Sequence, residues 1–274
     1  MHKLLLLDFD GTLCLGEDPI LAYAGQVDAE LDQRGLPGPG GRGVHEVVAE
    51  ALADDELLVQ EIEYDPDAAE HEAGVTPLAA EQEPATGTRA PHPSSWPLQD
   101  GYQLVQLLAM QSGLTHEETG HAFRQARRTL LAAGLASTDL HAPAEAAPLL
   151  NQLRGAAGEA GVVVVLLTNA PAEDFGAWLE VLGLQSSFDA VTNSAQKPVG
   201  MPQAVERARQ IAAPPVPPAQ ILSVGDIWAN DLAHVDELGG QTILIDRFGT
   251  GLGSPSHRVR SFAEAAPVIR RWAG

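Results

Sequence analysis

Two aspartates separated by one residue follow the first apolar run of the chain. The segment LLLLDFDGTL, residues 4–13, leads four leucines into Asp8 and Asp10, with Gly11 and Thr12 behind them. Two carboxylates ~4 Å apart repel each other by about 4 kcal/mol at a surface-like dielectric constant. A cluster that contains such carboxylates at the end of a buried strand would therefore need a bound cation.

Polar residues also follow two later strand candidates. Thr168 and Asn169 come directly after VVVVLL at 162–167, and Lys197 comes after FDAVT at 188–192. The chain contains only two lysines against fourteen arginines. Because a compact ammonium suits a point contact with a phosphoryl oxygen, we interpret Lys197 as a site residue.

A third strand candidate, ILSV at 221–224, is followed by Asp226 and Asp231. In open α/β sheets, ligands bind beyond the carboxyl ends of the strands, so all these side chains are expected at one rim. Together with Asp8 and Asp10 they offer oxygen ligands, without Cys or His. This donor set favours Mg²⁺ over Zn²⁺.

The elements that must position these side chains alternate between strands and helices. Predicted strands cover 3–9, 162–167, 188–192, 221–224 and 242–246. Predicted helices between the later strands cover 172–183, 201–212 and 229–239. The alternation predicts an α/β fold with a doubly wound parallel sheet.

The interval from 13 to 161 carries helical patterns and no convincing strand. Predicted helices run from Asp18 to the residue before Gly35, and then over 44–60, 98–112, 116–133 and 144–157. For 116–133, Thr115 and Glu118 predict a capping box. We therefore expect an α/β core formed by 1–13 and 144–274, with residues 14–143 as a helical insert.

Part of this insert has a composition that resists packing. Residues 54–83 hold eleven Asp or Glu and no Lys or Arg, and residues 84–97 add four prolines. The sequence predicts an acidic, proline-rich loop at about 54–97.

Charge and composition exclude several classes of partner. The net charge of −21 argues against nucleic acid and against anionic membrane surfaces. The single cysteine, Cys14, allows no internal disulfide, and no apolar stretch approaches the ~20 residues of a membrane helix. The leucine run is also too short for a signal peptide. We expect a cytoplasmic protein with no nucleic-acid or membrane partner, and the sequence leaves its oligomeric state open.

Four motifs together resemble those of a known family. DFDGT at 8–12, Thr168-Asn169, Lys197-Pro198 and GDIWAND at 225–231 resemble, in order and spacing, the motifs of the haloacid dehalogenase (HAD) superfamily of phosphotransferases. The resemblance covers the first dozen residues and about 144–250. It implies a Rossmann-like HAD core with the insert as a C1-type helical cap.

The resemblance implies roles for the residues of the first motif. Asp8 is expected to be the nucleophile that forms an aspartyl-phosphate, and Asp10 the acid and base. The backbone carbonyl of Asp10 is expected to bind the metal. Gly11 gives the turn freedom beside the phosphate, and Thr12 braces it.

The other motifs imply a phosphate site and a metal site. The Thr168 hydroxyl and the Asn169 backbone N–H are expected to bind phosphoryl oxygens. Asp226 is expected to ligate Mg²⁺ directly, and Asp231 to orient it through water or Lys197. Trp228, inside the fourth motif, is interpreted as a packing residue of the core or of the cap.

The function that the resemblance implies is a Mg²⁺-dependent phosphatase of a small phosphorylated metabolite. A phosphomutase of the β-phosphoglucomutase type and a non-catalytic HAD-fold binding or regulatory protein remain as alternatives. The family's dehalogenases lack a second aspartate at the position of Asp10, which disfavours halide chemistry. Its phosphonate hydrolases need a cap lysine, and the insert contains none.

Overall fold

The computed structural model describes residues 2–55, 57, 59–60, 95–96, 98–155, 161–212 and 214–274. The predicted acidic loop at about 54–97 lies almost entirely outside these residues. The chain forms two compact units. The first consists of Met1–Gly16 and Asp139–Gly274, and the second of Glu17–Thr138.

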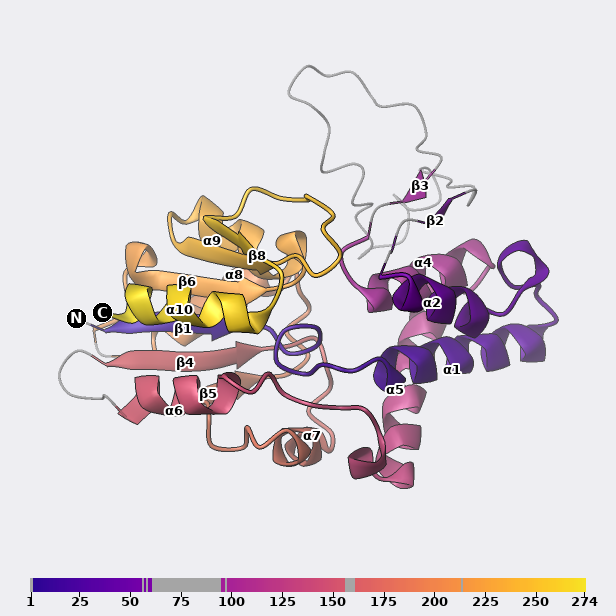
Figure 1. The fold of residues 1–274 in the computed structure, drawn as a ribbon, viewed down its shortest axis with the longest axis horizontal. Coiled ribbons are helices and arrows are strands. Elements are labelled where there is room, and N and C mark those ends of the chain that lie inside the picture. Colours follow the sequence, from indigo (N-terminus) through magenta and orange to yellow (C-terminus); the bar gives the residue numbers. More distant parts are fainter. Residues whose placement is uncertain are drawn as a thin grey trace, which may run out of the picture. The chain divides into compact units, whose positions relative to one another are not determined.

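The first unit is built on a six-stranded parallel sheet (Figure 1). Its strands are β1 (Lys3–Leu7), β4 (Val162–Leu167), β5 (Ala190–Thr192), β6 (Ile221–Gly225), β7 (Gln241–Ile245) and β8 (His257–Val259). They lie in the order β5-β4-β1-β6-β7-β8. The prediction of a doubly wound parallel α/β sheet is confirmed.

Helices cover both faces of this sheet. They are α6 (Ala146–Gly155), α7 (Phe175–Val181), α8 (Met201–Arg209), α9 (Ala233–Glu237) and α10 (Phe262–Ala273). Leu4 and Leu6 of β1 pack in one cluster with the buried face of α8 and with Val235 of α9. Leu5 and Leu7 point to the opposite face, over which α6 and α10 lie in Figure 1. Four consecutive leucines are therefore buried because β1 has a helical layer on each side.

The register brings the ends of three strands level with one another. Leu7, the last residue of β1, pairs with Leu166 of β4 and with Val224 of β6. Asp8, Thr168 and Asp226 therefore leave the sheet at the same carboxyl edge, where ligands of such folds bind.

The second unit is mainly helical. Its helices are α1 (Asp18–Arg34), α2 (Val44–Ala53), α4 (Gly101–Gln111) and α5 (His116–Ala133), and a two-stranded antiparallel pair joins β2 (Val59–Gln60) to β3 (Ser95–Trp96). The predicted capping box opens α5. Thr115 Oγ1 accepts the Glu118 N–H at 3.3 Å, and the Glu118 carboxylate accepts the Thr115 N–H at 2.8 Å. Among the described residues, none of the helices combines the length and apolar character needed to cross a bilayer.

Several predicted elements differ from the observed ones. The predicted strand 3–9 ends at Leu7, because the chain turns as soon as it leaves the sheet. The predicted helix 44–60 is wrong beyond Ala53: Asp54 and Asp55 form a turn, and such residues favour turns over helix interiors. The strands β2 and β3 correct the expectation that the insert contains none.

The C-terminal part of the sheet unit differs as well. The predicted helix 229–239 is a π-helical turn, Trp228–Leu232, followed by α9. Strand β8 and helix α10 were not predicted. β8 is a short, largely exposed edge strand without an apolar pattern. Helix α10 did carry a signal, because Ser261 accepts the Glu264 N–H as an N-cap and Phe262, Ala265 and Ile269 recur at helical spacing.

Close helix packing in the second unit predicts that alanine has opposite effects on stability at two of its glycines. A Cβ on Gly101 would lie 2.9 Å from Ile20 Cδ1 and 3.4 Å from Leu52 Cδ2, whereas a Cβ on Gly25 in α1 would meet open space. We expect Gly101→Ala to lower the free energy of unfolding by about 1–3 kcal/mol through overpacking. Gly25→Ala should raise it by about 0.5–1 kcal/mol because alanine favours helix. Urea denaturation followed by circular dichroism measures both, and a Gly101→Ala variant as stable as Gly25→Ala would contradict the packing.

Candidate active site

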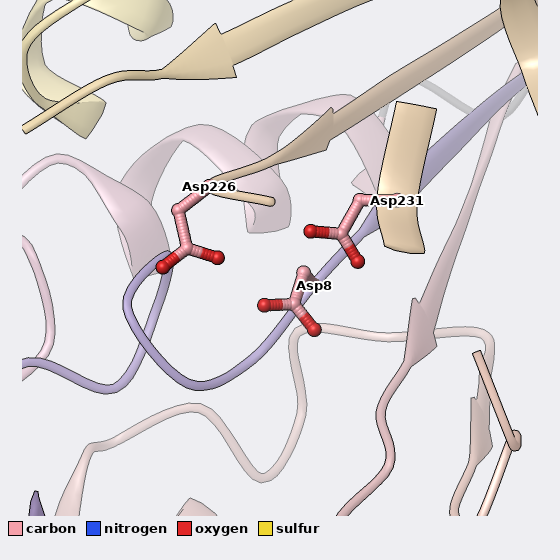
Figure 2. Close-up of side chains that lie close together, drawn as sticks. All are labelled: Asp8, Asp226 and Asp231. Carbon is pink, nitrogen blue, oxygen red and sulfur yellow. The ribbon is translucent and has the colours of Figure 1, made fainter. Parts of the chain in front are cut away.

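Three buried carboxylates meet at the carboxyl edge of the sheet. Asp8 follows β1, Asp226 follows β6, and Asp231 lies in the turn Trp228–Leu232. One oxygen of each carboxylate lies within 4.8 Å of the other two. Figure 2 shows the three side chains turned toward a common space. We call Asp8, Asp226 and Asp231 the carboxylate cluster.

Lys197 joins two members of the carboxylate cluster. Its Nζ donates to Asp8 Oδ1 and, at 2.6 Å, to Asp231 Oδ1, and all three side chains are at least nine-tenths buried. Three carboxylates and one ammonium leave a formal charge of −2. A divalent cation would neutralise this charge.

Burial and mutual repulsion change the proton affinities in the cluster. Burial, with a smaller contribution from the charge of Asp10, raises the pKa of Asp8 although the charge and hydrogen bond of Lys197 oppose this shift. Burial and the charge of Asp8 raise the pKa of Asp231 to about 7. Burial alone would lower the pKa of Lys197, but the charges of Asp231 and Asp8 raise it above its ordinary value. The lysine is therefore charged at neutral pH, and the raised pKa values of Asp8 and Asp231 indicate that one lysine does not offset the burial and mutual repulsion of the two carboxyl groups.

Two glycines let the carboxylates approach the backbone. Gly11 has φ +80°, and a Cβ there would lie 1.9 Å from Asp226 Oδ2. A Cβ on Gly225 would lie 2.4 Å from Asp231 Oδ2. Gly11 was predicted to free the turn, and the structure adds that its missing side chain makes room for Asp226.

The turn after β1 is held by one carbonyl. Phe9 O accepts the N–H groups of Thr12 at 3.2 Å, Leu13 at 2.8 Å and Cys14 at 2.8 Å. The Thr12 side chain is fully buried, and its hydroxyl makes no hydrogen bond within the described part of the chain.

Asp10 is half-buried, and its carboxylate does not belong to the carboxylate cluster, although its charge raises the pKa of Asp8.

The Asn169 side chain has a role that the sequence analysis missed. Its Nδ2 donates to the Lys197 carbonyl at 3.0 Å, and its Oδ1 accepts the Lys197 N–H at 2.7 Å. A side-chain amide presents an N–H donor beside a carbonyl acceptor, as a peptide group does, so it can pair with a backbone in this way. Asn169 therefore holds the backbone of the residue whose ammonium enters the cluster.

The loop that carries Lys197 is tightly folded. Ser194 and Gln196 have positive φ angles of 47° and 54°, a conformation that is sparsely populated for residues other than glycine. A Cβ on Gly200 would lie 1.9 Å from the Ala195 carbonyl oxygen, so only glycine fits there. Such local strain is common at functional sites, where the surrounding structure maintains it.

The donor set fits a hard divalent cation. The cluster offers carboxylate oxygens, without a histidine or cysteine among its members. Asp231 has both oxygens engaged, since Oδ1 accepts from Lys197 and Oδ2 accepts the Ile227 N–H at 3.1 Å. Asp8 and Asp226 are therefore the members best placed to hold the cation directly.

Comparison with known proteins identifies a family. A family model described as "Hydrolase: haloacid dehalogenase-like hydrolase" matches residues 2–233. A comparison with curated proteins found no match.

Three solved structures illustrate the likeness. A predicted phosphoglycolate phosphatase from Haemophilus somnus has a TM-score of 0.53 at 16% identity, over 98% of each chain. The HAD-hydrolase YfnB from Bacillus subtilis, bound to magnesium, has a TM-score of 0.51 at 15% identity, also over 98% of each chain. A 2-haloacid dehalogenase from Pseudomonas syringae has a TM-score of 0.47 at 17% identity, over 99% of this chain and 100% of its own. At such identities, the first two likenesses show a shared fold and do not identify a substrate.

The buried ion pairs predict that removing the Lys197 ammonium lowers the free energy of unfolding by an amount that depends on pH. In the presence of a chelator at pH 7.5, Lys197→Met should lower the free energy of unfolding by about 3–5 kcal/mol, because Asp8 and Asp231 would stay buried without their partner. The pKa of Asp231 is already raised from 3.8 to about 7 beside the lysine. A carboxyl group whose pKa is raised in the folded state adds to the free energy of unfolding below about pH 4. This added stability is lost as the pH rises through 7. The penalty should therefore be smaller at pH 5.

Lys3 provides the control for this experiment. It is the other lysine of the chain, and its ammonium donates to the backbone carbonyls of Trp272 and Ala273, which do not titrate. Lys3→Met should lower the free energy of unfolding by the same amount at pH 5 and at pH 7.5. Equal pH dependence of the two variants in denaturant unfolding would refute the charge argument.

Proposed function

The chain belongs to the haloacid dehalogenase-like hydrolases, and within this family we propose that it is a Mg²⁺-dependent phosphatase of a small phosphorylated metabolite. The observation that carries the proposal is Lys197 bridging Asp8 and Asp231, with Asp226 beside them. This arrangement offers one carboxylate as a nucleophile and surrounds it with the charges that phosphoryl transfer requires.

The proposed reaction proceeds through Asp8. A carboxylate oxygen of Asp8 attacks phosphorus, the bond from phosphorus to the ester oxygen breaks, and Asp10 gives that oxygen its proton. Water then attacks the aspartyl-phosphate while Asp10 takes up a proton, and inorganic phosphate leaves. The Lys197 ammonium, already bound to Asp8, contacts a phosphoryl oxygen and limits the repulsion between two anions.

Asp8, Asp226 and the backbone carbonyl of Asp10 would hold Mg²⁺, which would offset the charge of the carboxylates and of the transferred phosphoryl group. Asp231 acts indirectly in this proposal. Its two oxygens are engaged by Lys197 and by the Ile227 N–H, so it fixes the ammonium and the turn that carries Asp226.

Thr168 and Asn169 form the proposed phosphate site. The Thr168 hydroxyl oxygen accepts the Ala170 N–H at 3.0 Å, which leaves the hydroxyl proton available for a phosphoryl oxygen. The Asn169 backbone N–H is the second donor, and the Asn169 side chain keeps Lys197 in place. In this proposal Gly11 and Thr12 shape the turn that carries Asp10, and the Glu17–Thr138 unit serves as the cap.

Halide chemistry is the competing activity within the family. A halide ion leaves without a proton, whereas the oxygen that leaves a phosphate ester is a strong base and needs one. Asp10, the second aspartate of the DFDGT motif, can supply that proton, and this favours phosphate esters over haloacids. A phosphomutase uses the same residues but passes the phosphoryl group to a second hydroxyl of the substrate.

Phosphate release and chloride release distinguish these activities. The purified protein with Mg²⁺ should release phosphate from members of a panel of sugar phosphates, phosphoglycolate and nucleotides, and should release no chloride from 2-chloroacids. Asp8→Asn should lower phosphate release by about 10³-fold or more, and Asp10→Asn by about 10²–10⁴-fold.

The matched control is Asp32→Asn, which makes the same substitution at an exposed residue of α1 and should leave the rate unchanged. Chloride release without phosphate release would decide for a dehalogenase. Transfer of labelled phosphate to a second substrate hydroxyl would decide for a phosphomutase. Activity that survives Asp8→Asn, or no activity on any substrate of the panel, would overturn the proposed catalysis at this site.

A further inference from the structure

The connection between β7 and β8 is organised around Asp246. This residue follows β7, so it lies at the same carboxyl edge of the sheet as the carboxylate cluster. Its Oδ1 accepts the Thr250 N–H at 2.8 Å and the Thr250 hydroxyl at 2.9 Å. Its Oδ2 accepts the Gly251 N–H at 3.0 Å and a guanidinium N–H of Arg258 at 2.7 Å. One buried carboxylate thereby fixes both arms of the connection.

Arg258 closes the connection from the other end. Its Nη2 donates to the carbonyl oxygens of Gly251 at 3.2 Å, Leu252 at 2.8 Å and Gly253 at 2.8 Å, while its Nη1 binds Asp246. The planar guanidinium presents its N–H groups in a fixed geometry, so the two N–H groups of Nη2 are shared among three carbonyls while Nη1 holds the carboxylate. Residues 246–258 therefore form a folded unit, which we call the brace.

The backbone of the brace lies against the indole ring of Trp228. Gly253 has φ +73°, and a Cβ built on it would lie 2.4 Å from Trp228 Cγ and 2.4 Å from Trp228 Cδ2. Only glycine can therefore place the backbone this close to the indole ring. The half-buried Trp228, interpreted from sequence as a packing residue, packs against the brace.

Trp228 lies between two members of the carboxylate cluster. Asp226 precedes it by two residues, and Asp231 follows it by three within the same π-helical turn. The Asp231 N–H donates to the Ile227 carbonyl at 3.0 Å, and the Ile227 N–H donates to Asp231 Oδ2 at 3.1 Å. A shift of Trp228 therefore moves a short, internally bonded segment that carries both carboxylates.

We propose that the brace fixes Trp228 and thereby sets the spacing of Asp226 and Asp231, so that residues 246–258 tune the affinity of the carboxylate cluster for its divalent cation. The inference rests on the proposed function in requiring that the cluster binds a cation. It concerns residues beyond 233, where the match to the family model ends. Gly253 and Arg258 are positioning residues in this view.

Two glycines of the brace supply a matched pair of variants. Gly251 and Gly253 have nearly the same backbone conformation, with φ +75° and φ +73°, so alanine carries a similar backbone penalty at either position. A Cβ on Gly251 meets nothing within 4 Å, whereas a Cβ on Gly253 collides with Trp228. Gly253→Ala therefore tests the contact, and Gly251→Ala controls for the strain.

The measurement is calorimetric titration of the full chain with Mg²⁺ alone. We expect Gly253→Ala to weaken Mg²⁺ binding about 10-fold or more, and Gly251→Ala to stay within about twofold of the wild type. In the phosphatase assay, Gly253→Ala should raise the Mg²⁺ concentration for half-maximal activity, with a smaller change in kcat at saturating Mg²⁺. A merely structural defect would instead lower kcat at every Mg²⁺ concentration.

Arg258→Lys is the second test and leaves Gly253 intact. A lysine keeps the charge but cannot hold three carbonyls and Asp246 together, so it should also weaken Mg²⁺ binding about 10-fold. Mg²⁺ affinity equal to that of the wild type in Gly253→Ala and in Arg258→Lys would overturn the brace while leaving the proposed function intact. A wild-type protein that binds no Mg²⁺ would overturn the proposed function itself, and the brace with it.

Discussion

The structure depends on keeping like charges close together inside the protein. Asp8, Asp226 and Asp231 are buried at one edge of the sheet, and Lys197 is the cation that holds two of them. A buried charge is tolerated when it is paired and its position is fixed. Much of the surrounding sequence serves this requirement. Leucines on both faces anchor β1, glycines leave room beside the carboxylates, and the Asn169 amide holds the loop that delivers the ammonium.

The same charges explain why one family can host different reactions. A carboxylate nucleophile held by an ammonium at the end of a rigid strand can attack phosphorus or carbon. What decides between these reactions is how the leaving group is handled and whether a second carboxylate can carry a proton. Asp10 follows Asp8, the proposed nucleophile, by two residues but stays outside the carboxylate cluster. This separation suits a group that must change its protonation state, because a residue locked in a network of charges is less free to do so.

The residues that meet at the carboxyl edge of the sheet could be predicted from sequence, whereas most of the contacts that hold them in place could not. Apolar runs identify buried strands, and parallel strands deliver their following residues to one edge, so the meeting of Asp8, Asp226 and Lys197 followed from local patterns. The Asn169 amide and the Asp246–Arg258 pair depend on loop conformations, for which the sequence offers no periodicity. β8, β2 and β3 are strands of only two or three residues, which is too short to show an alternating pattern of apolar and polar side chains. The turn at Trp228–Leu232 is π-helical where an α-helix was predicted, because the Ala233 N–H bonds to the Trp228 carbonyl five residues back, and hydrophobic periodicity does not indicate such a bond.

The position of β1 has a consequence for how the protein is made. This strand occupies residues 3–7, yet its two neighbours in the sheet begin at Val162 and Ile221. As the chain emerges from the ribosome, no partner strand exists for Leu4–Leu7 until the chain has been synthesised beyond Val162. Contacts so distant in sequence slow folding, and exposed apolar strands are prone to aggregate in the meantime. The residues of the Glu17–Thr138 unit are all synthesised during that interval, so the helical unit can complete its own folding before the sheet forms around the nascent active site.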